Sequence, residues 1–262
     1  MFHRQSQSVY IPIFLLAATS VVLIGLQMSL LGWTTWGVGL MSLTLLAKGK
    51  RKHILAVYLS LGILGAMDIS TDLVISNFLQ MTFGLTLAAG LPYVLTRRYF
   101  NDRTLIYSWK LRRWTKTQVW YFIGIFAGAY FVLPAYFRTS EAYLNWSVEP
   151  TFLSVLLLFL GTQAVGLWDE LFFVNSTLPL LRKQLSFRWA NIVQAILFTS
   201  FLYELGFTGW GPVIVFPFAL SQGVILQKTK SLSFIVALHL SIDLLLFFIL
   251  VNLHTGWFDI FI

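Results

Sequence analysis

Nine apolar runs recur along this 262-residue chain, and no other feature of the sequence limits the fold as strongly. The runs lie near residues 10–28, 31–47, 53–67, 77–96, 118–136, 151–173, 190–205, 212–227 and 232–252. A helix needs ~20 apolar residues to cross a bilayer, so nine crossings would use about 180 residues. The remainder suffices for short connections but not for a separate soluble domain.

The composition agrees with this pattern. Hydrophobic residues make up 58% of the chain and charged residues only 11%, whereas soluble domains have ~25% charged residues. A soluble domain could not cover so much apolar surface with so few charges. Disorder, a collagen-like fibre and a nucleic-acid-binding globule are therefore excluded. We predict an all-α fold, a polytopic transmembrane bundle of about eight to nine helices, whose partner is the lipid bilayer and not nucleic acid.

The acidic residues and the histidine that lie inside apolar runs all fall in the C-terminal part of the chain, which suggests that the two parts have different roles. We expect residues 1–150 to form N-terminal transmembrane helices and residues 151–262 to form core helices that carry a site. Both parts would belong to a single membrane unit. The chain contains no cysteine, so disulfides and thiolate metal sites are excluded.

The basic residues predict an orientation. If the N-terminus is inside and the runs alternate, 17 of the 18 Lys and Arg residues fall in inside loops and only Arg138 falls outside. This asymmetry is what the positive-inside rule describes. We therefore expect a multi-pass protein, in the plasma membrane, with a cytoplasmic N-terminus. The net charge of +8 then reflects a belt that faces anionic lipid head groups.

Four acidic residues and one histidine interrupt the C-terminal apolar runs: Asp169, Glu170, Glu204, Asp243 and His239. One Asp at mid-membrane costs ~2.5–3.5 kcal/mol even on the lenient insertion scale, so such residues usually face a cavity or a partner. No Lys or Arg lies in the same runs. Protons or a bound cation must therefore neutralise the carboxylates.

Spacing allows several of these residues to converge. His239 and Asp243 are four residues apart and share one helix face. At ~1.5 Å per residue, Asp169 and Asp243 each lie roughly 18–20 Å from the inner ends of their runs. His239 lies roughly 12 Å in, and Glu204, at roughly 24 Å, fits worst.

Each residue also has a purely structural interpretation. His239 could be a neutral imidazole bonded to a neighbouring helix, and Asp243 could cap a broken helix or bond to Ser200 or Asn191. Glu204 precedes Gly206 and could simply reach the outer interface. Adjacent carboxylates inside an apolar run serve no packing purpose, so Asp169 and Glu170 are the hardest to explain structurally.

The order of these residues resembles a known family. Trp168-Asp169-Glu170-Leu171-Phe172-Phe173 resembles the first motif, E-E-x-x-x-R, of the CAAX-protease and bacteriocin-processing (CPBP) intramembrane metalloproteases. His239-Leu240-Ser241-Ile242-Asp243 is similar to their third motif, H-x-x-x-N/D. The resemblance covers about residues 160–252. It implies that Asp169 activates a water, that Glu170 supports it, that His239 binds metal or water, and that Asp243 stabilises the oxyanion or acts as a ligand.

The chain departs from the family pattern at three positions. Asp169 is one methylene shorter than Glu, and Val174 stands where the motif has Arg. The second motif, F-x-x-x-H, lacks its His, because counting four residues from Phe198 or Phe201 gives a leucine. Glu204 is the nearest residue there that could ligate a metal.

Two functions from different classes follow. The first is an intramembrane metalloendopeptidase in which His239, Glu204 and Asp169 hold a divalent metal ion, Zn, or Mn or Fe given the carboxylate-rich ligand set. The sequence does not identify its substrate, which could be a peptide or a membrane protein. The alternative is a catalytically degenerate relative that acts as a membrane scaffold, a lipid-binding unit or a proton-coupled carrier, with protons on the carboxylates instead of metal.

Overall fold

The structure, a computed structural model, describes residues 9–47, 51–105, 109 and 113–257. Its helices are α1 (Tyr10–Thr19) with η2 (Ser20–Gly25), α2 (Ser29–Leu46), α3 (Arg51–Ala66), α4 (Ile75–Val94) with η3 (Leu95–Tyr99), α5 (Lys116–Ser140), η4 (Ala142–Asn145), α6 (Phe152–Asp169) with η5 (Glu170–Thr177) and α7 (Leu178–Leu181), α8 (Phe187–Glu204), α9 (Gly211–Thr229) and α10 (Leu232–Thr255). Apart from the single 3-10 turn η4, the described residues thus form nine continuous helices, and they form no strand. Each predicted apolar run lies on one of them, which confirms the all-α prediction.

Five of these helices are long and apolar enough to cross a membrane: Ser29–Leu46, Ile75–Tyr99, Lys116–Ser140, Phe152–Leu181 and Leu232–Thr255. Large apolar side chains also face outward, with Leu30 84% and Phe152 83% exposed. Exposed apolar surface of this extent marks contact with a membrane. The chain is therefore a multi-pass helical membrane bundle, and the lipid bilayer is its environment.

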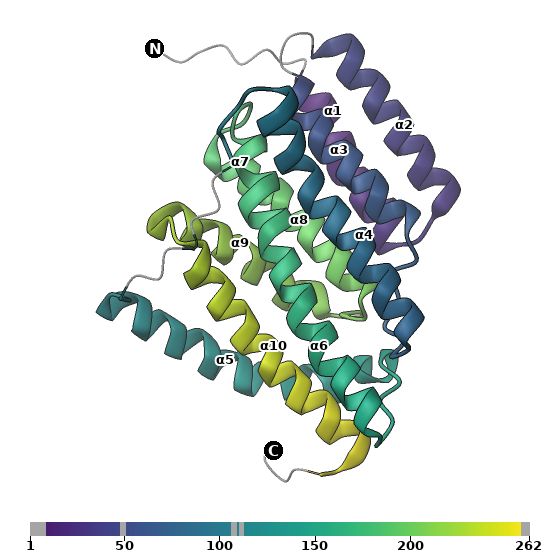
Figure 1. Cartoon of the computed structure of the whole chain (residues 1–262), viewed down its shortest axis with the longest axis vertical. Coiled ribbons are helices and arrows are strands. Elements are labelled where there is room, and N and C mark those ends of the chain that lie inside the picture. The colour runs from purple at the N-terminus through teal and green to yellow at the C-terminus, as the bar shows by residue number, and fades with distance from the viewer. Residues whose placement is uncertain (1–8, 48–50, 106–108, 110–112, 258–262) are drawn as a thin grey trace.

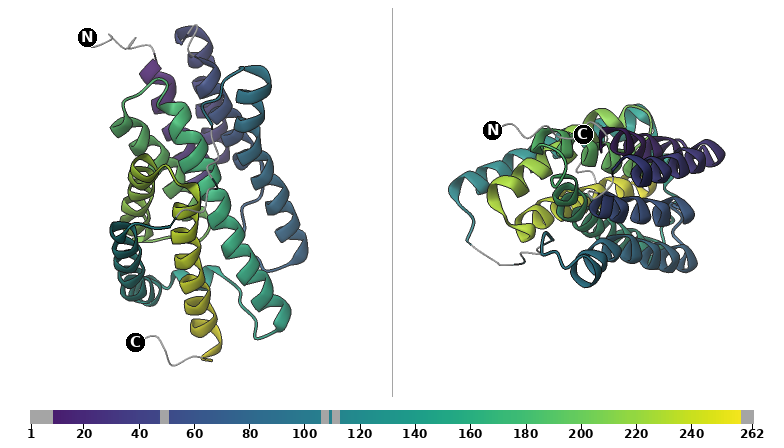
Figure 2. Two further views of the ribbon diagram at one scale, coloured as in Figure 1. Left: turned by 60° about the vertical axis from the view of Figure 1, so that its left-hand side comes forward. Right: turned by 90° about the horizontal axis from the view of Figure 1, so that it is seen from above.

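The helices are arranged in three groups. Figures 1 and 2 show α1–α4 on one side of the bundle and α5 on the opposite side, with α6 and α8–α10 between them. Helix α10 packs against both α6 and α5, and α8 packs against α9 and η2. A single cluster of buried apolar side chains includes residues from before and after position 150. The two expected parts therefore share one core.

Figure 1 shows successive helices of α1–α4 running in alternating directions, and α6 and α8 running in opposite directions. The start of α1 and the α7–α8 connection lie at the upper end, and the α5–α6 connection and the end of α10 lie at the lower end. Such alternation is what the orientation prediction requires, but the side of the membrane that each end faces stays a prediction. Five of the basic residues counted for it lie outside the described residues: Arg4, Lys48, Lys50, Lys110 and Arg112.

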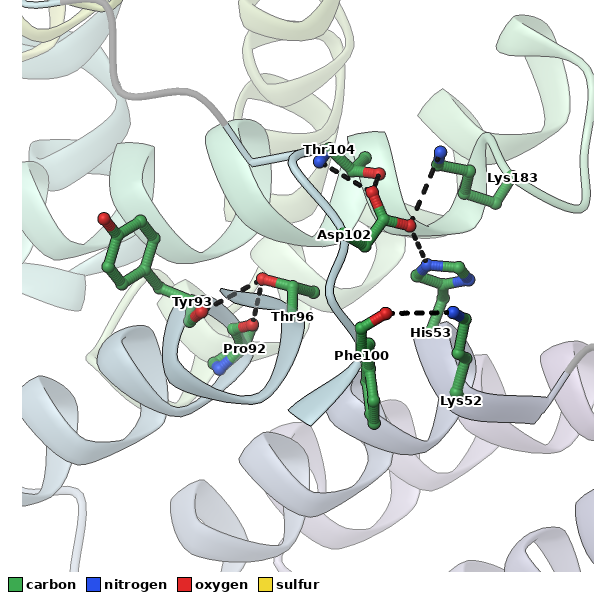
Figure 3. A network of polar contacts seen from close by, with 9 residues as sticks. All are labelled: Lys52, His53, Pro92, Tyr93, Thr96, Phe100, Asp102, Thr104 and Lys183. Carbon is green, nitrogen blue, oxygen red and sulfur yellow. Dashed lines mark hydrogen bonds and ion pairs between the residues drawn. The ribbon is translucent and has the colours of Figure 1, made fainter. Parts of the chain in front are cut away.

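A polar cluster joins three connections at the upper end (Figure 3). The Asp102 carboxylate accepts hydrogen bonds from Thr104, contacts His53 Nε2 at 2.7 Å and lies 3.6 Å from Lys183 Nζ. The Thr104 hydroxyl, with smaller contributions from His53 and the Thr104 N–H, holds the pKa of Asp102 well below its usual value despite partial burial. The cluster therefore ties α3 to the segments that follow η3 and α7.

Two capped helices carry the predicted site. The Thr151 hydroxyl accepts a hydrogen bond from the Ser154 N–H at the start of α6, and the Ser231 hydroxyl accepts one from the Phe234 N–H at the start of α10. Such caps satisfy N–H groups that have no partner within the helix. Helix α10 ends at Gly256, whose φ of 67° suits a residue without a side chain.

Candidate functional site

The candidate site lies where α6 continues into η5, opposite the middle of α10. Asp169 is the last residue of α6 and Glu170 the first of η5, while His239 and Asp243 face them from α10. These four residues are between 0% and 7% exposed. Segment η5 is a π-helix, a rare conformation that is frequent at functional sites. The structure therefore brings together the four residues that the sequence suggested as catalytic.

His239 is the centre of the cluster. Its Nδ1 lies 2.9 Å from Glu170 Oε1, within hydrogen-bond distance. Its Nε2 lies 3.7 Å from Asp243 Oδ1, which is too far for a direct hydrogen bond but close enough for an ion pair. Asp169 lies close enough to interact electrostatically with His239, Asp243 and Glu170. The imidazole thus joins the carboxyl groups of two helices.

Three carboxyl oxygens of the cluster have no hydrogen-bond partner: Asp169 Oδ2, Glu170 Oε2 and Asp243 Oδ2. The Gln222 amide faces Glu170 but forms no hydrogen bond of normal geometry with it. Buried polar atoms without partners are rare and call for an explanation such as catalysis or an exchangeable bound molecule. One imidazolium balances only one carboxylate, so the remaining carboxyl groups depend on protons or on a guest for neutralisation.

Aromatic rings hold the imidazole in place. The Phe198 ring stacks on His239 with centroids 5.8 Å apart, and the Phe218 ring meets it edge-on at 5.1 Å. The residue of α8 that faces His239 is therefore an apolar ring and not the second histidine of the family pattern. Val174, at the motif's Arg position, is fully buried.

Gly166 sets the spacing between α6 and α10. A Cβ built on Gly166 would overlap Asp243 Oδ2 and lie 3.0 Å from Asp243 Cγ and 3.4 Å from His239 Cδ2. The missing side chain is therefore what leaves room for the Asp243 carboxylate beside α6. The sequence analysis overlooked this residue, although a glycine three residues before Asp169 was a visible signal.

An apolar cavity of about 530 Å³ opens onto the cluster. Asp169, His239 and Asp243 line it, whereas Glu170 does not. Its walls come from α4, α5, α6, α9 and α10, and they include Gly124 and Gly128 of α5. No atom lies within 4 Å of a Cβ built on either glycine. Their G-x-x-x-G spacing therefore widens the cavity here and does not mediate close helix packing.

Glu204 lies apart from the cluster. It ends α8, and its carboxylate accepts a hydrogen bond from Gln27 and interacts with Asp68, both in the N-terminal half. It therefore does not join Asp169 and His239, because the depth estimated from helix rise says nothing about which way a side chain points. That Glu204 reaches the outer interface of the membrane stays a prediction.

The donor set of the cluster does not fit the expected metal site. In the described part of the chain, no group of three or more His, Asp or Glu residues is arranged so that it could hold a metal ion. Glu204 bonds to Gln27 and points away from the cluster. The expected ligand trio of His239, Glu204 and Asp169 is therefore not assembled.

Comparison with known proteins supports the relationship that the motifs suggested. Residues 150–245 match the model of a family described as type II CAAX prenyl endopeptidase Rce1-like. This segment contains α6, η5, α8, α9 and the part of α10 that bears His239 and Asp243. No curated protein and no solved structure matches the chain. The resemblance to the CPBP family is thus confirmed for the segment that carries the site.

Proposed function

Because residues 150–245 have the sequence pattern of the Rce1-like CAAX prenyl endopeptidases, we propose that this chain is an intramembrane endopeptidase. It hydrolyses a peptide bond of a membrane-held substrate with a water activated by a carboxylate. The observation that carries the proposal is the position of Asp169, His239 and Asp243 in the wall of an apolar cavity, with unpartnered oxygens on both aspartates.

Asp169 is the general base of the proposed reaction. It lines the cavity, and its Oδ2 has no protein partner, so a water in the cavity is its natural hydrogen-bond donor. The water oxygen attacks the scissile carbonyl carbon while Asp169 accepts the water proton. When the C–N bond breaks, that proton passes to the leaving amine. A base placed in this way contributes ~10²–10⁴-fold to the rate.

Glu170 and Asp243 orient His239. In the proposed mechanism both ring nitrogens of His239 carry a proton. The Nδ1–H donates to Glu170, and the Nε2–H is directed toward Asp243 and the cavity. The 3.7 Å separation between Nε2 and Oδ1 leaves this donor free for the carbonyl oxygen, whose negative charge grows in the transition state. Glu170 is a positioning residue because it does not line the cavity.

The donor geometry supports no catalytic step through a metal, so none is included. The expectation of a divalent metal is tested directly by elemental analysis of the purified protein. Stoichiometric metal that disappears in His239→Ala would restore the metalloendopeptidase mechanism.

The basic-residue distribution supports a cytoplasmic N-terminus, and we place the protein in the plasma membrane as part of the same proposal. The apolar cavity would then lie within the bilayer and bind the part of the substrate next to the scissile bond.

The test uses the full chain in lipid nanodiscs and a peptide with a farnesylated cysteine followed by three residues. We expect release of the C-terminal tripeptide, detected by mass spectrometry, and a rate ~10²–10⁴-fold lower in Asp169→Asn. Glu204→Gln is the matched control, because it removes a carboxylate outside the cluster and should keep the wild-type rate.

Two results would contradict the proposal. One is equal cleavage by wild type and Asp169→Asn with both proteins folded. The other is the absence of cleavage by wild type while cells that carry Asp169→Asn and His239→Ala keep full function. The second result is expected of a scaffold or carrier, because a neutral amide mimics a protonated carboxyl group.

A further inference from the structure

A second cavity lies at the other end of η5, away from the candidate site. It has a volume of about 600 Å³ and lies between the α7–α8 connection and the turn from α9 to α10. Three cationic side chains line it: Arg182, Lys183 and Lys230. Its other polar lining residues are Thr104, Asn175 and Gln227, so no acidic residue is among them.

No carboxylate that lines this cavity neutralises its positive charge. Lys183 is engaged, because its Nζ lies 3.6 Å from Asp102 (Figure 3). Arg182 and Lys230 both donate hydrogen bonds to the same neutral oxygen, Gln227 Oε1. In the part of the chain that the structure describes, neither of these cations forms a salt bridge. Two positive charges therefore converge on one amide oxygen.

A buried hydrogen-bond donor, like the two cations, would favour an anionic ligand in this cavity. Asn175 lies on η5, is only 4% exposed and lines the cavity, and its Nδ2 has no hydrogen-bond partner. A buried N–H group without a partner is costly, because it has lost its hydrogen bonds to water without gaining new ones. The C-terminus of α9 and the N-terminus of α10 meet here with opposite dipoles, so the side chains determine the sign of the field. Two cations and one N–H donor are complementary to an anion with several acceptor oxygens.

We propose that this cavity binds a phosphate group, held by Arg182, Lys230 and Asn175. The guanidinium matches two phosphate oxygens at once, and the ammonium adds a point charge. The site is separate from the carboxylate cluster and does not depend on the proposed peptidase activity.

Nearby aromatic residues favour the phosphate of a lipid head group as the source. Trp114 is 40% exposed, and its ring lies 5.0 Å from that of Phe234 in the first turn of α10. Trp189, near the start of α8, is 56% exposed. Exposed tryptophans gather where the hydrocarbon of a bilayer meets its head groups. We therefore take the lipid phosphate as the expected ligand of this cavity.

The experiment measures the thermal midpoint of the full chain in detergent at constant ionic strength. Three probes are titrated separately: short-chain phosphatidylglycerol, short-chain phosphatidylcholine and inorganic phosphate. We expect a saturable rise of the midpoint with phosphatidylglycerol and a smaller rise with phosphatidylcholine, whose choline repels the cations. A saturable rise with inorganic phosphate alone would identify free phosphate as the ligand and keep the site.

The variants separate binding from folding. Arg182→Gln should weaken phosphatidylglycerol binding about tenfold or more. Lys230→Gly removes the ammonium and suits the left-handed backbone at this position, where φ is 52°. It should therefore lose affinity without losing stability. Asn175→Leu should likewise leave the free protein stable, because the amide that it replaces has no partner.

Lys228→Gln is the matched control. Lys228 is exposed on α9, two residues from Lys230, and does not line the cavity. Unchanged binding in this variant beside weakened binding in Lys230→Gly supports the site. The proposal is overturned if no probe raises the midpoint, or if Lys228→Gln weakens binding as much as Lys230→Gly does, since a diffuse basic surface would then explain the affinity.

Discussion

Replacing Gly166 by alanine tests the geometry of the carboxylate cluster with a single methyl group. The new Cβ would overlap Asp243 Oδ2 and lie 3.0 Å from Asp243 Cγ, so the carboxylate has to move. Gly161, one helical turn and a half earlier on α6, is the matched control: it also lines the apolar cavity, but no atom lies within 4 Å of a Cβ built there, so its methyl group displaces nothing. Both variants gain the same helix propensity.

The expected magnitudes follow from these contacts. Gly→Ala inside a helix stabilises by about 0.5–1 kcal/mol, and this gain should appear undiminished in Gly161→Ala. Overpacking costs about 1–3 kcal/mol. The low end applies to Gly166→Ala, because Oδ2 is the tip of a side chain that can rotate away. The two variants should therefore differ in stability by about 1 kcal/mol.

The effect on activity should be larger than the effect on stability. A displacement of about 1 Å in a catalytic group can cost about 10²-fold in rate. We expect such a loss in Gly166→Ala and little change in Gly161→Ala. Unfolding in mixed micelles and release of the tripeptide measure the two quantities on the same preparations. Gly166→Ala with the stability and rate of Gly161→Ala would refute the account of how α6 and α10 meet.

Three further predictions concern the cavity, the polar cluster and the orientation. Gly128 lines the apolar cavity, and no atom lies within 4 Å of a Cβ built on it, so Gly128→Leu should fill part of the cavity. This variant should raise KM for the farnesylated peptide several-fold, and an unchanged KM would exclude this cavity as the binding site. Asp102→Asn should destabilise by about 1 kcal/mol at neutral pH. Because the folded-state pKa of Asp102 is lowered, this contribution exists above pH ~4 and disappears as the pH falls further; a thermal-midpoint difference independent of pH would contradict it. Single cysteines at Arg103 and Lys183, introduced into this cysteine-free chain, should resist an impermeant thiol reagent in intact cells, and labelling of both would reverse the orientation.

The helices could be predicted from the sequence because hydrocarbon permits few alternatives to helical backbone. The shared face of His239 and Asp243 followed from their four-residue spacing. The convergence with Asp169 and Glu170 followed from the high cost of isolated carboxylates in an apolar run.

What could not be predicted depends on rotation and on contacts between distant segments. Helix rise gives the depth of Glu204 but not its direction, and Gln27, its partner, is 177 residues away. The stacking of Phe198 on His239 depends on how α8 packs, which no local pattern encodes. Nor does the order Asp169-Glu170-Leu171 indicate a π-helix. The resemblance implied different roles for the two adjacent carboxylates, but only the structure shows that Asp169 lines the cavity and Glu170 does not.

The π-helix after Asp169 also has a consequence for how insertions and deletions would act on this protein. A π-helical turn holds more residues than an α-helical turn, so it resembles an α-helix with an inserted residue. Deleting one residue between Glu170 and Thr177 would return the segment toward α-helical winding. The residues on either side of the deletion would keep their directions, because the extra residue and its wide turn would disappear together. A deletion in the regular helix of α6 would instead rotate everything beyond it by about 100°. The π-helical segment is therefore where this helix would tolerate the loss of one residue best.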